Sequence, residues 1–361
     1  MILSVVDPVP DETVRPYLTT RQLVPENQES PVHFMNLTNI PEELLYRRNH
    51  FAYPTLQEEA YRITIQGAVS QPRVFDNQTI RSLPSRNVHV VLECAGNKRA
   101  FFEPKTFGEQ WERGAWAQGV WTGVPLSELL RYAGMKPSAQ EVVAEGWDMG
   151  RRHDMPGIFP FARSIPVATA MHPDTLLAYA YNGSPLSPRH GFPYRLIVPR
   201  WYAMASVKWV RRIFVTESPF QGPFQSIDYQ YYPDKTNPQI KYPVTIQHVN
   251  SSILTPRDRS IMRKGRHAIH GTAWTGLGEI DRVEISVDGG TSWREAKIER
   301  PTDRPHGWVL WRYDWDANQA GEYSILSRAR DTSGRIQPMR AYWNRKGYGY
   351  NAADRIKILI E

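Results

Sequence analysis

The sequence predicts an α+β domain followed by an all-β domain of the immunoglobulin-like sandwich type. Up to about residue 245, helical and strand patterns mix without the regular βαβ order of a doubly wound sheet. Beyond that point, short strands recur at turn-punctuated spacing, which is typical of a sandwich. The 361 residues also include 29 Pro and 24 Gly, a content that favours short strands and loops over helical bundles.

We divide the chain into three segments. Residues 1–45 are rich in Pro and Glu, and we expect an N-terminal arm that is extended apart from a short helix at 41–45. Residues 46–245 form the α+β domain and residues 246–361 the sandwich. The first ten residues show no basic segment, twin arginine or long apolar run, so we expect a cytoplasmic protein. A processed periplasmic chain would look the same.

Apolar runs and their punctuation predict the elements of the α+β domain. Strands are expected at 61–66, 88–92, 176–181, 195–198 and 207–216, and helices at 125–133 and 164–171. The first helix has Pro125 at its start and Gly134 just past its end, the usual asymmetry of helix punctuation. The run VHVVL at 88–92 is β-branched and apolar, which indicates a buried strand that ends at Glu93.

The sandwich domain is predicted from seven short candidate strands. They lie at 244–249, 266–274, 282–287, 292–298, 308–314, 322–330 and 355–360. Asp288-Gly289-Gly290 separates two of them and contains residues that tolerate positive φ, which favours a tight hairpin turn.

Composition excludes several function classes. The single cysteine, Cys94, excludes an intrachain disulfide, a multi-thiolate zinc site, an iron–sulfur cluster and a CxxCH haem attachment. No apolar run approaches the roughly 20 residues of a membrane-spanning helix. The net charge of +7 is spread over doublets such as Arg151-Arg152 with no nucleic-acid-binding motif, so we expect no nucleic-acid partner. A small anion in a pocket suits this charge better.

Cys94 is the most informative candidate for chemistry. It follows the buried strand and precedes Gly96 and the basic pair Lys98-Arg99. Nearby positive charge favours the thiolate, which is the form that binds metals. The alternative is a small core residue, because a free cysteine is commonly buried.

The segment VVLECAGNKRAFF resembles the cysteine segment of the sulfite oxidase family of molybdenum enzymes, which reads CAGNRR or close to it. Other family elements occur in the family order. They are Arg48-Asn49-His50, HGFPYR at 190–195, VKW at 207–209, GTAW at 271–274, SVDGG at 286–290 and Trp343-Asn344. This ordered set spans about residues 45 to 360 and is far more specific than one short motif.

The resemblance implies a molybdopterin-binding α+β domain and a sandwich that forms a homodimer. It also implies one molybdenum ion on a pterin dithiolene, with Cys94 as its only protein ligand and without haem. A soft thiolate suits a metal that is already held by sulfur. By position, the cofactor-binding residues are Asn49, His50, Cys94, Asp148, His190, Arg195 and Lys208.

The family's substrate pocket surrounds the metal with positive charge. The matching residues here are Arg48, Arg99, Trp111, Asp228, Tyr229 and Lys346. The resemblance implies that sulfite is oxidised to sulfate by oxygen-atom transfer and that a separate acceptor, for which a cytochrome is one candidate, takes the electrons. Fixed guanidinium groups bind such oxyanions through charge-assisted hydrogen bonds.

The chain departs from the family pattern at two positions. Lys98 replaces an arginine of CAGNRR, at a place that need not touch substrate. Lys346 stands where the closing WNLRG of the family has a pocket arginine, and we expect its ammonium to take that role unless Arg345 does. Two alternatives stay open: a related enzyme that acts on nitrate or another oxyanion, and a non-catalytic immunoglobulin-like binding protein. Tyr229 favours the oxidase over the nitrate enzyme.

Overall fold

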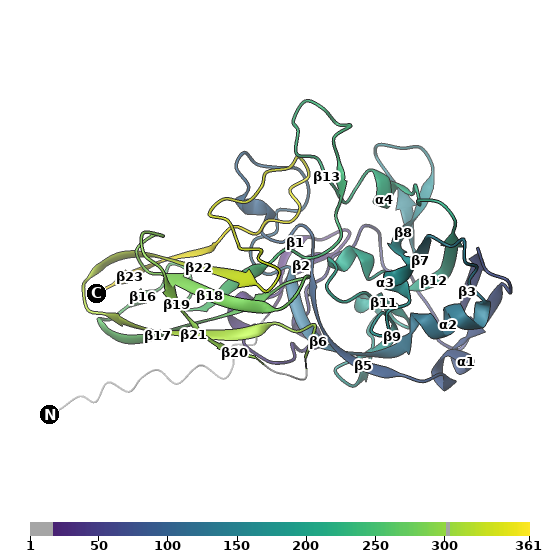
Figure 1. The fold of residues 1–361 in the computed structure, drawn as a ribbon, viewed down its shortest axis with the longest axis horizontal. Helices are drawn as coiled ribbons and strands as arrows, with labels where there is room; N and C mark the ends of the chain where they lie inside the picture. The colour runs from purple at the N-terminus through teal and green to yellow at the C-terminus, as the bar shows by residue number, and fades with distance from the viewer. Residues whose placement is uncertain (1–16, 301–303) are drawn as a thin grey trace.

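The computed structural model describes residues 17–300 and 304–361, which form two lobes (Figure 1). The first lobe combines two five-stranded sheets with short helices, and the second is a two-sheet sandwich. The predicted order of an α+β domain followed by an all-β domain is therefore confirmed. The first sixteen residues of the predicted arm lie outside the described residues. Within the described ranges, no helix has both the length and the apolar character that crossing a membrane requires.

The described part of the predicted arm is folded onto the first lobe. The antiparallel strands β1 (Thr19–Gln22) and β2 (Asn27–Glu29) form a hairpin that lies between the lobes (Figure 1). Two 3₁₀ helices follow at Val32–Phe34 and Glu42–Leu44, and the second confirms the short helical turn predicted at 41–45. The apolar residues Met35, Ile40, Leu44 and Leu45 are buried in a shared core. An extended arm is therefore wrong for this part, because these side chains pack inside the domain.

One sheet carries the strand that leads to the cysteine. Its strands run in the order β10-β9-β6-β5, β11 also pairs with β9, and every pairing is antiparallel. Their bounds are β5 (Arg86–Glu93), β6 (Trp116–Pro125), β9 (Leu176–Tyr181), β10 (Ser184–Pro185) and β11 (Arg195–Ile197). Strands β5, β9 and β11 confirm three predictions. The sequence did not predict β6, because Gly119 and Gly123 weaken its pattern. A Cβ atom on Gly119 would lie 2.2 Å from the ring of Tyr181, so the ring requires glycine there.

The second sheet of this lobe has the order β4-β3-β12-β7-β8, with one parallel pairing between β12 and β3. Its strands are β3 (Arg62–Gly67), β4 (Arg73–Asp76), β7 (Glu141–Arg151), β8 (Ile158–Pro166) and β12 (Val210–Thr216). The helix predicted at 164–171 is wrong in its first half. Ser164 and Ile165 continue the β7–β8 ladder opposite Val143 and Val142, so only α3 (Val167–Ala170) is helical. Cross-strand pairing outweighs local helix propensity there.

Short helices join the strands of the first lobe. The predicted helix is confirmed as α2 (Leu126–Ala133), which buries Leu129 and Leu130 and ends at Gly134 with φ +66°. The helix α1 (Asn77–Ser82) is capped by Asp76, whose carboxylate accepts the backbone N–H of Thr79 at 2.8 Å. The remaining helical turns are α4 (Pro223–Ser226) and 3₁₀ helices at Arg99–Phe101, Pro188–His190 and Ala203–Ala205.

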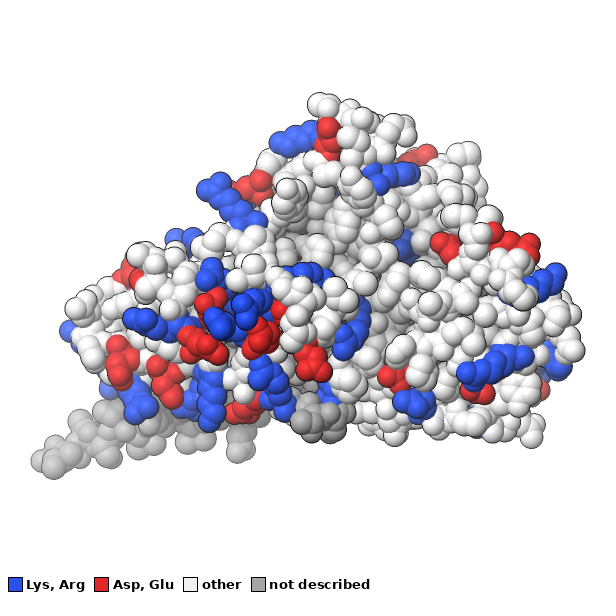
Figure 2. Space-filling model, in the orientation of Figure 1, with Lys and Arg blue, Asp and Glu red and all other residues white. Residues whose placement is uncertain are grey.

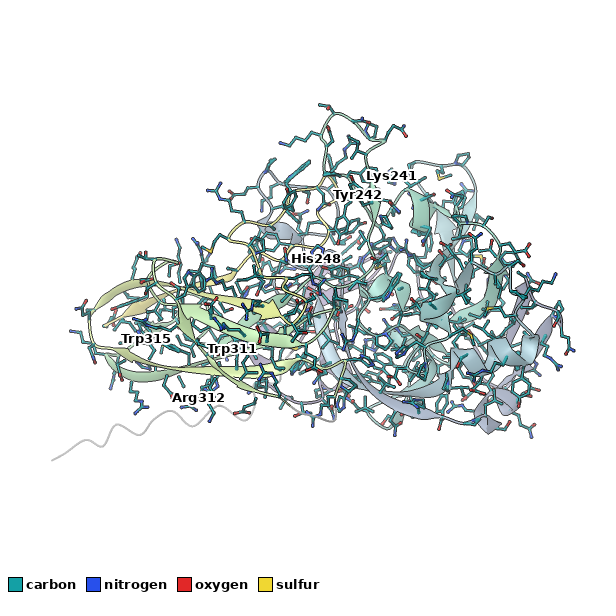
Figure 3. The ribbon with its side chains drawn as sticks, viewed as in Figure 1. Lys241, Tyr242, His248, Trp311, Arg312 and Trp315 are labelled. Carbon is teal, nitrogen blue, oxygen red and sulfur yellow. The ribbon has the colours of Figure 1, made fainter. Side chains whose placement is uncertain are left out.

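The chain crosses between the lobes through β13 (Gln230–Tyr231) and β14 (Tyr242–Pro243), which form a small hairpin. Figure 3 labels Tyr242, the first residue of β14, with Lys241 next to it, and His248 at the junction of the lobes. The strand predicted at 244–249 is wrong, because that stretch contributes only an isolated bridge between Ile246 and Trp201. The predicted domain boundary at 245–246 falls between β14 and the first sandwich strand.

The second lobe is the predicted sandwich. One sheet has the order β15-β17-β21-β20 and the other β16-β23-β22-β18-β19. Their strands are β15 (Asn250–Thr255), β16 (Ile261–Met262), β17 (Gly265–Trp274), β18 (Ile280–Ser286), β19 (Arg294–Glu295), β20 (Lys297–Glu299), β21 (Val309–Ala317), β22 (Gly321–Asp331) and β23 (Asp354–Ile360). Five predicted strands are confirmed as β17, β18, β21, β22 and β23. The strand predicted at 292–298 instead divides at buried Ala296, because β19 pairs with β18 in one sheet and β20 with β21 in the other.

Alternation along β21 shows how the sandwich core is built. Trp311 and Trp315 are buried, whereas Arg312 between them is exposed, and Figure 3 shows Arg312 at the outer side of the sheet. Basic and acidic residues are interspersed on the viewed face of this lobe (Figure 2). Ion pairs such as Arg328 with Glu284, at 2.8 Å, join neighbouring strands of the sheet. This face therefore shows no patch of a single charge sign.

Candidate functional site

The cysteine begins a tight turn at the end of β5. Cys94 is buried, and its Sγ accepts the backbone N–H of Gly96 at 3.4 Å. The turn closes through the N–H of Asn97, which donates to the carbonyl of Cys94 at 2.9 Å. Lys98 then adopts φ +62°, and the 3₁₀ helix at Arg99–Phe101 follows. The turn residues that end the buried strand thus present one thiol at a fixed place.

The second lobe holds the strand end before this thiol. The Glu93 carboxylate accepts hydrogen bonds from Asn250 Nδ2 at 3.1 Å and Trp274 Nε1 at 2.8 Å, both from the sandwich. It also accepts one from Asn97 Nδ2 at 3.0 Å, within the cysteine turn. Burial raises the pKa of Glu93 to about 7, although these hydrogen bonds and the charge of Lys98 act in the opposite direction. The loop that carries Cys94 is therefore anchored on both domains.

A hydrophobic contact between the lobes lies beside this network. Trp116 on β6 stacks on Trp274 of the sandwich with ring centroids 4.6 Å apart, and it meets Trp308 edge-on at 5.1 Å. All three indoles are buried in the core that also contains Cys94. The position of the cysteine loop relative to the sandwich is thus fixed by packing as well as by hydrogen bonds.

A cavity opens next to Cys94 and gathers most of the residues predicted for the site. The predicted residues that line it are Arg48, Asn49, His50, Cys94, Asp148, His190, Arg195, Lys208 and Tyr229. The remaining four lie beyond its lining: Arg99, Trp111, Asp228 and Lys346. The structure thus brings together side chains that are up to 181 residues apart in the chain.

The N-terminal hairpin fixes the segment that carries Arg48 and Asn49. Asn27, which is fully buried, accepts the backbone N–H of Asn49 at 2.7 Å through its Oδ1. The side chain of Asn49 donates in turn to the carbonyl of Glu26 at 2.5 Å. Backbone hydrogen bonds in both directions between Gln28 and the residue before Arg48 add a short antiparallel contact. The hairpin therefore holds in place a segment that lines the cavity.

Two cations and an acid lie on one side of the cavity. Lys208 Nζ donates to Asn49 Oδ1, and burial holds the pKa of Lys208 well below its ordinary value, as the neighbouring Arg195 also does. Arg195 Nε donates to the carbonyl of Ser206 at 3.2 Å. The Oδ1 atom of Asp148 is buried and has no hydrogen-bond partner among the residues that the structure describes. This side of the cavity suits a ligand with both hydrogen-bond donors and negative charge.

His190 lines the cavity but is held by protein groups. Its Nδ1 lies 3.2 Å from Glu42 Oε1 and 3.1 Å from Ser187 Oγ, and its Nε2 lies 3.3 Å from the carbonyl of Leu45. Burial lowers the pKa of His190, although the carboxylate of Glu42 opposes this change. A ligand in the cavity therefore meets a ring whose orientation is already fixed.

On the other side of the cavity, Arg48 and His50 meet Tyr229, which lies far along the chain from both. The hydroxyl of Tyr229 lies 2.8 Å from His50 Nε2, and Arg48 Nη2 lies 3.3 Å from His50 Nδ1. Burial, together with the charge of Arg48, holds the pKa of His50 well below its ordinary value, so the imidazole is neutral at pH 7. Tyr229 adopts φ +44° and stacks on Tyr348 at 5.2 Å, which turns its hydroxyl toward the cavity.

Arg99 lies behind the cysteine turn. Its guanidinium donates to the carbonyls of Lys346 at 3.0 Å and Glu109 at 2.9 Å. A Cβ atom on Gly96 would lie 2.6 Å from this guanidinium, so the turn needs glycine for the arginine to approach. Burial raises the pKa of the Cys94 thiol, whereas the charges of Arg48 and Arg99 act in the opposite direction. These two arginines therefore favour the thiolate that a metal requires.

The other three predicted substrate residues occupy different surroundings. Trp111 is fully buried, and its indole N–H has no hydrogen-bond partner in the described part of the chain. Lys346 Nζ lies 2.7 Å from Asp228 Oδ1, so its ammonium is in an ion pair beside Tyr229. Arg345, the alternative to Lys346, donates to the carbonyl of Lys235 at 3.1 Å instead.

Several residues at this site were not predicted from the sequence, among them Tyr46 and Arg152. Tyr46 lines the cavity, and it precedes the Arg48 segment by two positions. Arg152 lies in the turn between β7 and β8, and its Nη1 lies 2.6 Å from Asp228 Oδ2. The only sequence signal for Arg152 is its place in the doublet Arg151-Arg152, and such a doublet is typical of solvent-exposed charge. Its contact with Asp228 spans 76 residues and was not accessible from spacing.

Comparison with known proteins agrees with this arrangement. Residues 50–224 match the model of the oxidoreductase molybdopterin binding domain, and residues 241–361 match that of the Mo-co oxidoreductase dimerisation domain. The chain is 31% identical to the sulfite oxidase of Arabidopsis thaliana, over 92% of this chain and 91% of that protein. The chain belongs to the sulfite oxidase family. It is accordingly a molybdopterin oxidoreductase with a cofactor-binding domain and a dimerisation domain.

Two further proteins are similar to this chain. The mitochondrial sulfite oxidase of Drosophila melanogaster is 31% identical over 93% of this chain, which spans 62% of that relative's length. The solved structure of the sulfane dehydrogenase SoxCD from Paracoccus pantotrophus has a TM-score of 0.82 and 28% identity. This match covers 98% of the present chain and 92% of the SoxCD chain. Sulfite oxidase family architecture thus extends over nearly the whole sequence.

The cofactor of the sulfite oxidase family fits the residues around Cys94. The thiol of Cys94 lines the cavity and supplies the soft ligand that a sulfur-bound molybdenum accepts. The unpartnered Oδ1 of Asp148 would accept an N–H of the pterin, and the cations Lys208 and Arg195, which line the same cavity, would hold its phosphate. A buried acceptor without a partner is costly unless a ligand satisfies it.

Proposed function

We propose that this chain oxidises sulfite to sulfate and passes the electrons to a separate acceptor. In this reaction sulfite gains one oxygen atom from water and releases two protons and two electrons. The molybdenum–pterin group, when bound, supplies oxygen-atom transfer and takes up the electrons. One observation carries the proposal. Arg48 and Tyr229 line the cavity beside the only thiol, and the charges of Arg48 and Arg99 both act on that thiol.

The residues of the chain would bind and orient the substrate. The guanidinium of Arg48 lines the cavity and would donate hydrogen bonds to an oxyanion, and the charge of Arg99, beyond the lining, would add to the attraction. The neutral ring of His50 holds the hydroxyl of Tyr229 at 2.8 Å, so this group faces the substrate in a defined orientation. Preorganised donors of this kind need no reorganisation when charge develops on the substrate.

We also propose that two chains associate. The dimerisation domain at residues 241–361 supports a homodimer formed through the sandwich. Sedimentation of the purified holoenzyme tests this part, and a monomer at micromolar concentration would contradict it.

A sulfane sulfur compound is a second candidate substrate. It is favoured by the similarity to the sulfane dehydrogenase SoxCD, with a TM-score of 0.82. The ion pair of Lys346 with Asp228 also distinguishes the pocket from one with three free arginines. Both substrates need the cofactor, so only turnover separates them.

Metal analysis combined with a steady-state assay tests the proposal. The purified protein should contain one molybdenum per chain, and it should reduce a generic electron acceptor with sulfite. Parallel assays with a sulfane sulfur compound and with nitrate rank the alternatives. Cys94→Ser changes one atom and should keep the fold, as measured by circular dichroism, but abolish turnover. A metal-free wild-type protein, or a Ser variant as active as the wild type, would overturn the assignment.

A further inference from the structure

Asp228 places a carboxylate directly before Tyr229, beside the proposed oxyanion site. Its side chain is 16% exposed, so water screens this negative charge only in part. An uncompensated carboxylate here would repel a dianion. Burial raises the pKa of Asp228, but hydrogen bonds from Arg152 and the charge of Lys346 hold it below its ordinary value, so the group is ionised at pH 7.

Two cations share this carboxylate, one on each oxygen. Lys346 Nζ lies 2.7 Å from Oδ1, and Arg152 Nη1 lies 2.6 Å from Oδ2. An ammonium is a compact point charge, whereas an arginine side chain can cover both oxygens of a carboxylate with its planar fork. The lysine at position 346 therefore satisfies one oxygen, and Arg152 satisfies the other.

Arg152 is held firmly in this position. Asp154 binds its Nε at 2.9 Å and its Nη2 at 2.6 Å, which fixes the plane of the guanidinium. The side chain of Arg152 is 8% exposed, against 30% for Lys346, so its charge is the less screened of the two. Its Cζ lies 5.0 Å from the centroid of the Phe224 ring, which in turn lies 4.7 Å from that of His50. Arg152 is thus one ring away from the cavity.

We propose that Arg152 compensates for the lysine at position 346 by neutralising Asp228. Arg152 and Lys346 divide the carboxylate between them, so Asp228 presents no net negative charge to an oxyanion beside Tyr229. The inference rests on the proposed function and names the substrate class as a small dianion. Arg152 acts through Asp228 and is a positioning residue.

Binding of sulfate to the molybdenum-loaded enzyme, measured by calorimetry, tests this proposal alongside KM for sulfite. Arg152→Gln should weaken sulfate binding and raise KM by about tenfold, because one buried charge loses its partner. The kcat value should change little, whereas the melting temperature should fall, because Asp228 and Asp154 both lose the guanidinium of Arg152. Arg151→Gln is the matched control, since it removes the same charge from the exposed neighbour and should leave both constants unchanged.

Two double variants separate compensation from other roles. Lys346→Arg should restore binding in the Arg152→Gln protein, because one fork then covers both oxygens of Asp228. In an Asp228→Asn background, Arg152→Gln should have no further effect on sulfate binding or KM. The Asp228→Asn protein and its double variant also lack the buried Asp228 charge, so they can be compared even if Arg152→Gln alone fails to fold. Failure of the Lys346→Arg rescue, or a tenfold loss in the Asn background, would overturn the proposal. If sulfate binding depends on Arg152 but the enzyme does not turn over sulfite, the role of Arg152 stands and the proposed oxidation of sulfite is rejected.

Discussion

Lys98 forms an ion pair with Asp354 across the boundary between the two domains, with Nζ 3.1 Å from Oδ1 and both side chains buried. The ammonium also donates to Asn250 Oδ1 at 3.0 Å and to the carbonyl of Ser251 at 2.8 Å. Three acceptors thus surround the three donors of one ammonium. The departure from arginine in the cysteine segment is explained by this contact, which faces the sandwich rather than the substrate.

Lys98→Met should destabilise the protein by about 3 kcal/mol, because it leaves a buried carboxylate with one partner fewer. Arg113, whose guanidinium also binds Asp354, keeps the loss at the lower end of the range for broken buried pairs. Equilibrium denaturation of the holoprotein, followed by circular dichroism, measures the change. Lys264→Met, which removes an exposed lysine, is the control. Equal midpoints for the two variants would show that the ion pair contributes nothing.

Asn27→Ala should lower both the melting temperature and the pterin content of the purified protein. It removes the acceptor of the buried N–H of Asn49, and a buried donor without a partner costs about 1–3 kcal/mol. Asn27→Asp keeps an acceptor at this place and should retain pterin. Gln22→Ala removes only the partner of Asn27 Nδ2, at 2.7 Å, and serves as the control. Wild-type pterin content in Asn27→Ala would refute a positioning role for the hairpin.

Tyr229→Phe should lower kcat/KM for sulfite by about ten- to a hundredfold, the effect of losing one hydrogen bond to a charged partner. Its stability should change little, because only one hydroxyl is lost. Tyr242→Phe is the control, since Tyr242 is 59% exposed and belongs to the same small hairpin region. If both variants keep wild-type kcat/KM, Tyr229 does not act on the substrate.

Acidification should destabilise the junction of the lobes through His248. Burial lowers the pKa of this residue, and Arg335 adds to the effect, although the carbonyl of Gly349 opposes it. The unfolded chain therefore binds the proton more tightly, so stability falls as the pH drops below about 6.5, the ordinary value for histidine. The fall in melting temperature between pH 7.5 and 5.5 should be larger for the wild type than for His248→Gln. An equal fall in both proteins would rule out this contribution.

The cysteine loop could be predicted from sequence because its signals are local. A β-branched run, turn residues and a basic pair are adjacent, and Cys94 lies where they place it. The same holds for α2, whose Pro125 and Gly134 mark both of its ends.

Long-range contacts set the features that sequence did not reveal. β6 carries two glycines that the ring of Tyr181 and the backbone of a neighbouring strand require, so its pattern is not that of a buried strand. The pairing of Arg152 with Asp228 depends on the turn between β7 and β8 meeting the segment before β13. Neither contact produces a periodic pattern in the sequence, because each is created by the tertiary fold.

Because Glu93 and Lys98 are bound to the sandwich, cofactor binding and the association of two chains become linked equilibria. The cofactor would bind at a loop whose two ends are held by residues of the dimerisation domain. Association of two chains stabilises that domain and so favours retention of the cofactor. By linkage, the bound cofactor favours association by the same free energy. Dilution of the protein should therefore promote loss of molybdenum, and removal of the cofactor should weaken the dimer.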